Sequence, residues 1–414
     1  MLTIPSIYTD DNANYITWQA ILCFMKNHNI PYETAMKRSD AFEQIIEHGK
    51  ISQSNETAVL KWIDDVVLEG IKDVHVRYFP LDQKMKVLLR NQNDTTAYFS
   101  EFIAQDTLPH LCSNQYDKDF TLVSVRWMGE GKYRRVVFTY CKKLFTYETA
   151  KTSTSIKPID YPIIVEYYID GEWLLIMAKP RSNLYVYDSN GFDVNDPKPT
   201  TTDKEVDSVL RCIEQMMPLE KIDRKTSEDK LKKKLFYILD KYTRTPKEIE
   251  DAMTLNETHL DTISRTIADI CYIQDKCYAP SLKDIIDDIK NIAEKYFSIN
   301  WHDSQIFTQD RDAYPVKLKA TDEEDSKVKQ TSSSFEPLQK KSIFFDNKKM
   351  LQKNKSCDGV TFYWRRKNGK NPFPVSIDIK NGVCIFKFTQ FTAKEDIENV
   401  IFSIIGANEE TDKS

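Results

Sequence analysis

Residues 161–179 read YPIIVEYYIDGEWLLIMAK, which is two apolar segments joined by an Asp-Gly pair. Asp170-Gly171 is a strong β-hairpin signal, because both positions of the favoured two-residue turn need a positive φ. In the second segment both alternating sets of side chains are apolar, so we expect a strand that is covered on both faces. Five such segments follow one another between residues 121 and 188 and predict a central antiparallel β-meander.

Helical spacing of apolar residues dominates on both sides of this meander. Residues 10–72 predict a helical bundle, and a period of two then predicts strands at 74–79 and 84–89. Thr202 and Glu205 have the spacing of a capping box that opens a helix. Further amphipathic helices follow, and over residues 227–271 their order is that of a helix-turn-helix, with a rudimentary wing at 272–280.

These patterns predict an α+β multidomain protein. Low apolar content and many Lys, Asp, Glu and Ser residues from 317 to 339 indicate a flexible, partly disordered linker. The C-terminal piece regains apolar strands and a final helix. The expected parts are an N-terminal helical bundle (1–72), a β-rich domain (73–192), a helical, winged-helix-like module (203–300), the linker (301–341) and a small basic α/β domain (342–408).

Composition indicates a cytoplasmic protein of several domains. The 414 residues, 41% of them hydrophobic, are enough for several cores. No run of about 18 apolar residues is present, and the first residues lack the basic and apolar regions of an export signal, so we expect neither membrane association nor export. Eight scattered cysteines without a C-x-x-C pair are typical of buried thiols in a reducing compartment. The high content of Lys, Asn and Ile indicates an A+T-rich genome, either bacterial or that of a mobile element.

Positive charge is concentrated near the C-terminus. The formal net charge is −5, yet residues 340–370 contain ten basic and two acidic residues, which leaves about −13 for the remainder. Within this segment two aromatic residues adjoin four cations around an Asn368-Gly369 turn, a composition that suits stacking on bases and contact with phosphates. The candidate nucleic-acid-binding residues are Tyr363, Trp364, Arg365, Arg366, Lys367 and Lys370.

Catalytic motifs are largely absent from the sequence. It contains no phosphate-binding glycine loop, no nucleophile elbow and no zinc-protease motif, and its six histidines are isolated, so we expect no cofactor and no metal site. One constellation, Asp358 with Asp378 and Lys380, resembles the pattern of metal-dependent PD-(D/E)xK nucleases, although no proline precedes Asp358. That resemblance implies carboxylates that bind a divalent ion and a lysine that activates water.

The sequence therefore favours a non-enzymatic adaptor or scaffold subunit of a multiprotein assembly. Its partners would be other proteins, together with DNA or RNA held by the basic hairpin. The nuclease described above is one alternative. A DNA-binding regulator that uses the helix at 256–271 is another, with Arg265 as its test residue, but Glu257, Asp261 and Asp269 make that helix acidic and unsuited to a phosphate-lined groove.

Overall fold

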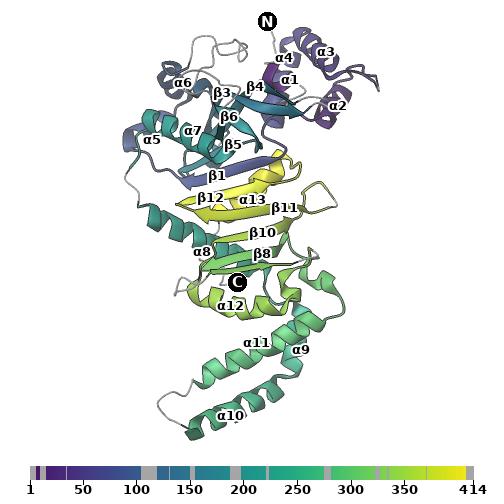
Figure 1. Ribbon diagram of the computed structural model, residues 1–414, viewed down its shortest axis with the longest axis vertical. Coiled ribbons are helices and arrows are strands. Elements are labelled where there is room, and N and C mark those ends of the chain that lie inside the picture. Colours follow the sequence, from purple (N-terminus) through teal and green to yellow (C-terminus); the bar gives the residue numbers. More distant parts are fainter. Residues whose placement is uncertain are drawn as a thin grey trace. The chain divides into compact units, whose positions relative to one another are not determined.

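The computed structural model shows a mixed α and β protein (Figure 1), which confirms the coarse fold class. It describes residues 6–9, 15–33, 35–103, 119–129, 131–149, 154–186, 197–220, 223–274, 281–321, 327–332, 335–369 and 371–406. Twelve strands occur in this part of the chain, and every strand pair whose register is resolved is antiparallel. No helix in these ranges is long and apolar enough to span a membrane.

The chain divides into two compact units, each built from segments far apart in sequence. The first unit comprises residues 1–227 and 383–398, and the second comprises 228–382 and 399–414. The strands of the first unit are β1 (Lys72–Tyr78), β2 (Thr121–Met128), β3 (Arg135–Thr149), β4 (Thr154–Tyr168), β5 (Trp173–Ala178), β6 (Leu184–Val186), β7 (Lys198–Thr200) and β12 (Val383–Phe388). Its strand order is β7-β6-β3-β4-β5-β1-β12, with β2 also paired to β3.

The quoted hairpin is present, but its turn differs from the prediction. β5 is buried along nearly all its length between β4 and β1, as expected for a strand that is apolar on both faces. The register pairs Tyr168 with Trp173, so the turn has four residues, and its positive φ (53°) falls at Glu172. The Glu172 carboxylate accepts a hydrogen bond from the Tyr78 hydroxyl (2.7 Å) and pairs with the Lys86 ammonium (2.6 Å), and these contacts hold the left-handed backbone.

Helices cover the first unit's sheet. α5 (Gln83–Leu89), α6 (Gln92–Ser100) and α7 (Thr202–Met216) contribute to one apolar cluster with β2 to β6. The strand predicted at 84–89 is helix α5, because the Asp82 carboxylate caps it by accepting from the Met85 N–H (2.8 Å). Helices are also present in the predicted range 10–72, as α2 (Trp18–Asn27), α3 (Arg38–Lys50) and α4 (Gln53–Val66). The short helix α1 (Ser6–Thr9) precedes this range and was not predicted.

α7 begins one residue earlier than the capping box predicts. Thr201, not Thr202, is the N-cap, and its hydroxyl oxygen accepts from the Lys204 N–H (3.3 Å). Glu205 is therefore available for another role. Its carboxylate is buried, pairs with the Lys142 ammonium (2.9 Å) and accepts from the Thr200 hydroxyl (2.6 Å).

The second unit contains a four-stranded sheet and several long helices. Its strand order is β11-β10-β8-β9, with bounds β8 (Ala313–Thr321), β9 (Lys327–Thr331), β10 (Gly359–Trp364) and β11 (Phe373–Lys380). Its helices are most of α8 (Arg224–Tyr242), from residue 228 onward, with α9 (Lys247–Leu255), α10 (Glu257–Gln274), α11 (Leu282–Asn300), α12 (Ser342–Asn354) and the short 3-10 turns Ser304–Phe307 and Leu338–Lys340. α13 (Lys394–Ile405) is divided between the units at residue 398.

Two predicted domain boundaries need correction. The range 301–341, expected to be a linker, contains β8 and β9, because Val316, Leu318 and Ala320 alternate with polar residues and bury one face. The range 342–408 is not an independent α/β domain, since β12 pairs with β1 while β10 pairs with β8. The strands and final helix predicted there are present. Most of the predicted wing, 275–280, lies outside the described residues.

The Lys142–Glu205 pair gives a stability prediction. Removing the carboxylate in Glu205→Ala leaves a buried ammonium unpaired, so the free energy of unfolding should fall by about 3–5 kcal/mol. Replacing both charges, Lys142→Met with Glu205→Leu, should recover most of that loss. The matched control is Glu47→Ala, whose exposed pair with Lys50 should be worth less than about 1 kcal/mol. Equal losses in chemical denaturation for Glu205→Ala and the control would contradict the role of burial.

Lys72 gives a prediction about pH. Burial, assisted by the neighbouring Lys179, lowers the pKa of Lys72 to about 7, and its ammonium nitrogen lies 6.0 Å from the centre of the Tyr15 ring. Because the folded state disfavours the charged ammonium, protonating Lys72 costs stability, and this cost grows as pH falls from the ordinary pKa of 10.5 to the folded-state pKa of about 7. The free energy of unfolding should therefore rise between pH 7 and 10 by a few kcal/mol, at about 1.4 kcal/mol per pKa unit. Lys72→Met should flatten this rise and stabilise the protein at pH 7. An unchanged slope would reject the assignment.

Candidate nucleic-acid interface

The sheet of the second unit has one covered face. Phe362 and Trp364 of β10 pack their rings against Tyr242 of α8, with centroid distances of 5.8 and 5.5 Å. On β9, the Gln330 side chain accepts a hydrogen bond from Asn347 of α12 (3.1 Å). Because successive side chains of a strand point to opposite faces, the neighbours of these residues face outward.

The opposite face is open and rich in lysine. Ladder register places Lys329, Lys319, Gly359 and Asp378 in one row across the four strands, and Lys317 in the next row. A shallow hollow of about 190 Å³ lies over these rows. We call the set formed by Lys317, Lys319, Lys329 and Lys380 the lysine face.

The lysine face has more positive charge than the neighbouring strand residues neutralise. Lys319 pairs with Asp378, and this pair is substantially exposed to solvent. Lys317, Lys329 and Lys380 make no ion pair with any residue in the described part of the chain. The connection between β8 and β9 contains four acidic residues at 322–325, which lie outside the described residues.

Aromatic side chains lie in the next row of the same open face. The rings of Tyr314 and Tyr363 stack, with centroids 5.7 Å apart and 14° between planes, and Phe335 meets Tyr363 edge-on at 5.4 Å. Partial burial of both tyrosines raises the pKa of their hydroxyls. Phe335 is 63% exposed and has a φ of 57°, a conformation that is rare for a bulky residue. Such strained backbone positions cluster at functional sites.

Two residues of the predicted basic hairpin have opposite environments. Tyr363 lies on the open face, as a base-stacking residue should. Trp364 is completely buried against Tyr242, so it is unavailable for stacking on a base, and the prediction for this residue was wrong. Alternation along β10 explains both positions, since neighbouring residues must face opposite ways.

The cations of that hairpin are partly occupied within the protein. The Arg365 guanidinium donates to the carbonyls of Thr308 (2.7 Å) and Gln309. The Arg366 guanidinium lies 4.9 Å from the centre of the Phe373 ring. Lys367 is exposed, and Lys370 lies outside the described residues. Lys317, Lys319 and Lys329 were missed because β8 and β9 fell in the range predicted to be a linker; the signal was the alternation around Leu318.

The carboxylates of the nuclease-like constellation are each engaged by a lysine. Asp358 pairs with Lys232 (2.8 Å) and accepts from the Thr321 hydroxyl (2.6 Å), and Asp378 pairs with Lys319. Burial lowers the pKa of Lys232, but its bonds to Asp358 and Glu228 outweigh burial and raise the pKa overall. A divalent ion at Asp358 would have to displace this ammonium. Among the described residues no group of three or more His, Cys, Asp or Glu has metal-binding geometry.

The predicted order of helices at 227–271 is present as α8, α9 and α10. Pro246 is the N-cap of α9, and the hydroxyl of the preceding Thr245 donates to Glu294 of α11 (2.7 Å). On α10, Arg265 is exposed beside Asp269, and Glu257 pairs with Lys290 (3.6 Å). The surface of this helix is acidic, which does not favour insertion into a DNA groove.

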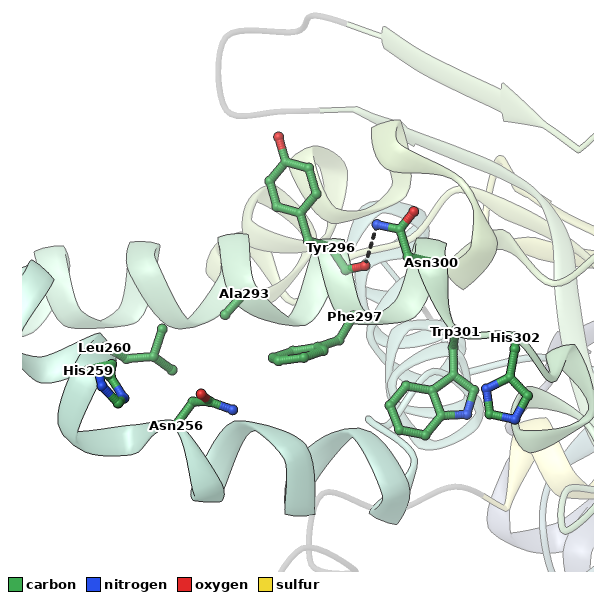
Figure 2. A pocket seen from close by; sticks show the side chains of 9 residues that line it. All are labelled: Asn256, His259, Leu260, Ala293, Tyr296, Phe297, Asn300, Trp301 and His302. Carbon is green, nitrogen blue, oxygen red and sulfur yellow. Dashed lines mark hydrogen bonds between the residues drawn. The ribbon is translucent and has the colours of Figure 1, made fainter.

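A second hollow, of about 560 Å³, lies between the α9–α10 turn and the C-terminal end of α11 (Figure 2). The described residues that line it include no Asp, Glu, Lys or Arg. Asn256 and Asn300 donate their amide N–H groups to helix carbonyls, at 2.8 and 3.0 Å, which leaves their oxygens as acceptors. The rings of Trp301 and His302 stack at its edge, 5.9 Å apart. This site was not foreseen from the sequence.

Comparison with family models, curated proteins and solved structures finds no match for this chain. The geometry of the sites themselves is therefore the guide to function. Of these, the open face of the β11-β10-β8-β9 sheet unites cations outside any described ion pair with exposed aromatic rings, which are the two components of a single-strand binding surface.

Proposed function

We propose that this chain binds single-stranded nucleic acid on the open face of the second unit's sheet, as a non-enzymatic subunit of a larger assembly. One observation carries the proposal: lysines without ion-pair partners among the described residues share a face with a stacked aromatic cluster that ends in the exposed Phe335. Lysine ammonium groups neutralise phosphates by releasing counterions, and an exposed ring offers a surface for an unpaired base.

The shape of the surface favours a single strand over a duplex. A four-stranded sheet presents a broad face with strands about 4.8 Å apart, too wide to enter a groove but suited to splayed bases. α10, the helix expected to enter a groove, has an acidic surface. The nuclease and regulator alternatives receive no support from the geometry of Asp358, Asp378 or Arg265. The expected protein partner and cytoplasmic location stay predictions.

Charge reversal on the lysine face tests the proposal directly. Lys319→Glu with Lys329→Glu should weaken binding of a fluorescent single-stranded oligonucleotide by at least about 10-fold at low salt. The slope of log affinity against log salt should become shallower by about 1.4, at about 0.7 for each phosphate that is no longer neutralised. The matched control is Lys247→Glu, an exposed lysine of α9 on another surface, which should leave both quantities unchanged.

Phe335→Ala separates stacking from charge in the same titration. Removing one base–ring stacking interaction costs about 1–3 kcal/mol, so affinity should fall roughly 5- to 100-fold while the salt slope stays the same. Binding by the charge variant equal to wild type would refute the proposal. A polyglutamate peptide that binds the wild type as well as the oligonucleotide does would instead indicate an acidic protein partner.

Asp378→Asn distinguishes nucleic-acid binding from nucleic-acid cleavage. The substitution removes the acidic residue that neutralises Lys319, so oligonucleotide affinity should rise a few-fold and the salt slope should steepen by about 0.7. Stability should change by less than about 1 kcal/mol, because the pair is exposed. If the wild type cleaves oligonucleotides with Mg²⁺ or Mn²⁺ and Asp378→Asn abolishes cleavage, the nuclease alternative holds instead.

A further inference from the structure

The α10–α11 helix pair exposes large apolar side chains on both helices. The exposed fractions are 48% for Ile263, 60% for Ile270, 49% for Ile292 and 62% for Tyr296. Isolated exposed apolar residues need no explanation, but a series along two adjacent helices marks an interaction surface.

These residues follow the heptad spacing of a coiled-coil seam. The seam positions alternate at intervals of three and four residues, as the a and d positions of a heptad do. On α10 they are Leu260, Ile263, Ile267 and Ile270, and on α11 they are Leu282, Ile285, Ile289, Ile292, Tyr296 and Ile299.

Contacts between the two helices use an adjacent stripe, and the seam residue Leu260 borders it. On α10 the small residues Ser264 and Ala268 are buried, and each directly follows a seam residue in the sequence. On α11 the matching side is identified by Lys290, which pairs with Glu257, and by Ala293, which lies across from Leu260 at the hollow (Figure 2). In antiparallel helices that meet through these flanking positions, the two heptad seams point to the same side.

We propose that the α10–α11 hairpin is half of a four-helix bundle, which the same hairpin of a second copy of this chain completes. The hairpin supplies two helices of nearly equal length, 18 and 19 residues, each with an incompletely covered seam. Two such hairpins related by a two-fold axis give a closed, isologous core.

The uncharged seam favours an identical copy over a charged partner. The charged residues that flank the α11 seam, Asp288 and Lys295, are already paired with Lys349 and Asp346 of α12. The corresponding flank of α10 carries the uncharged Thr266. The seam therefore has no net charge that would repel its own copy or select a partner of opposite sign.

The available area suits a dimer of moderate affinity. Each helix is about 27 Å long and the pair about 20 Å wide, so the face is on the order of 500 Å² per copy. The total is near the roughly 1,000 Å² expected for a specific interface. From this area we expect the chain to self-associate with a dissociation constant in the micromolar range.

Sedimentation equilibrium of the full chain without nucleic acid tests this inference over about 1–100 µM. Wild type should be a reversible dimer. Ile263→Lys with Ile270→Lys, and separately Leu282→Lys with Ile292→Lys, should each raise the dissociation constant at least about 100-fold. The matched control is Ile343→Lys, a 55% exposed residue of α12, which should dimerise like wild type.

Three results would overturn the proposal. They are a monomeric wild type at the highest concentration, a wild-type dissociation constant in either double variant, or a failure of the Ile343→Lys control to associate. Thermal unfolding of each variant shows whether the substitutions act on association and not on folding. Because no nucleic acid is present, the outcome is independent of the proposed binding function.

Discussion

Alternation of side chains along β10 constrains the second unit more than any single contact does. Once Phe362 and Trp364 are packed under α8, Thr361 and Tyr363 must face the other way. The neighbouring strands follow the same register, so their lysines reach the open face together. The same alternation therefore causes both the burial of apolar side chains on one face and the exposure of lysines on the other.

Local sequence patterns predicted helices and strands correctly where the period of apolar residues matches the set of side chains that the structure buries. β5 and the strands and helix of the C-terminal segment were predicted close to their observed bounds, because their apolar periods are long and unbroken. The prediction failed at β8, because the polar composition of the range was given more weight than the alternation of apolar residues within it. It also failed at 84–89, where a capping aspartate was needed to distinguish a short helix from a strand.

The candidate site was harder to predict than the fold, since it depends on pairing between distant segments. Tyr314 and Tyr363 are 49 positions apart in sequence, and only the β8–β10 register makes them neighbours. The same register places Lys319 beside Asp378, a neutralisation that no local motif reveals. The concentrated charge at 340–370 belongs to the same unit as the candidate site, but much of it is used internally. The Lys340 ammonium, for example, donates to three carbonyls at the end of α11.

The proposed dimer would bind nucleic acid more tightly than a monomer without any new type of contact, because it places two lysine faces in one particle. A single lysine face can neutralise few phosphates, so its affinity alone should be modest and strongly salt-dependent. A dimer presents two such faces, and the second binds the same strand at the effective concentration set by the first. This gain requires a strand long enough to reach both faces, so short oligonucleotides should bind the dimer no more tightly than they bind one face.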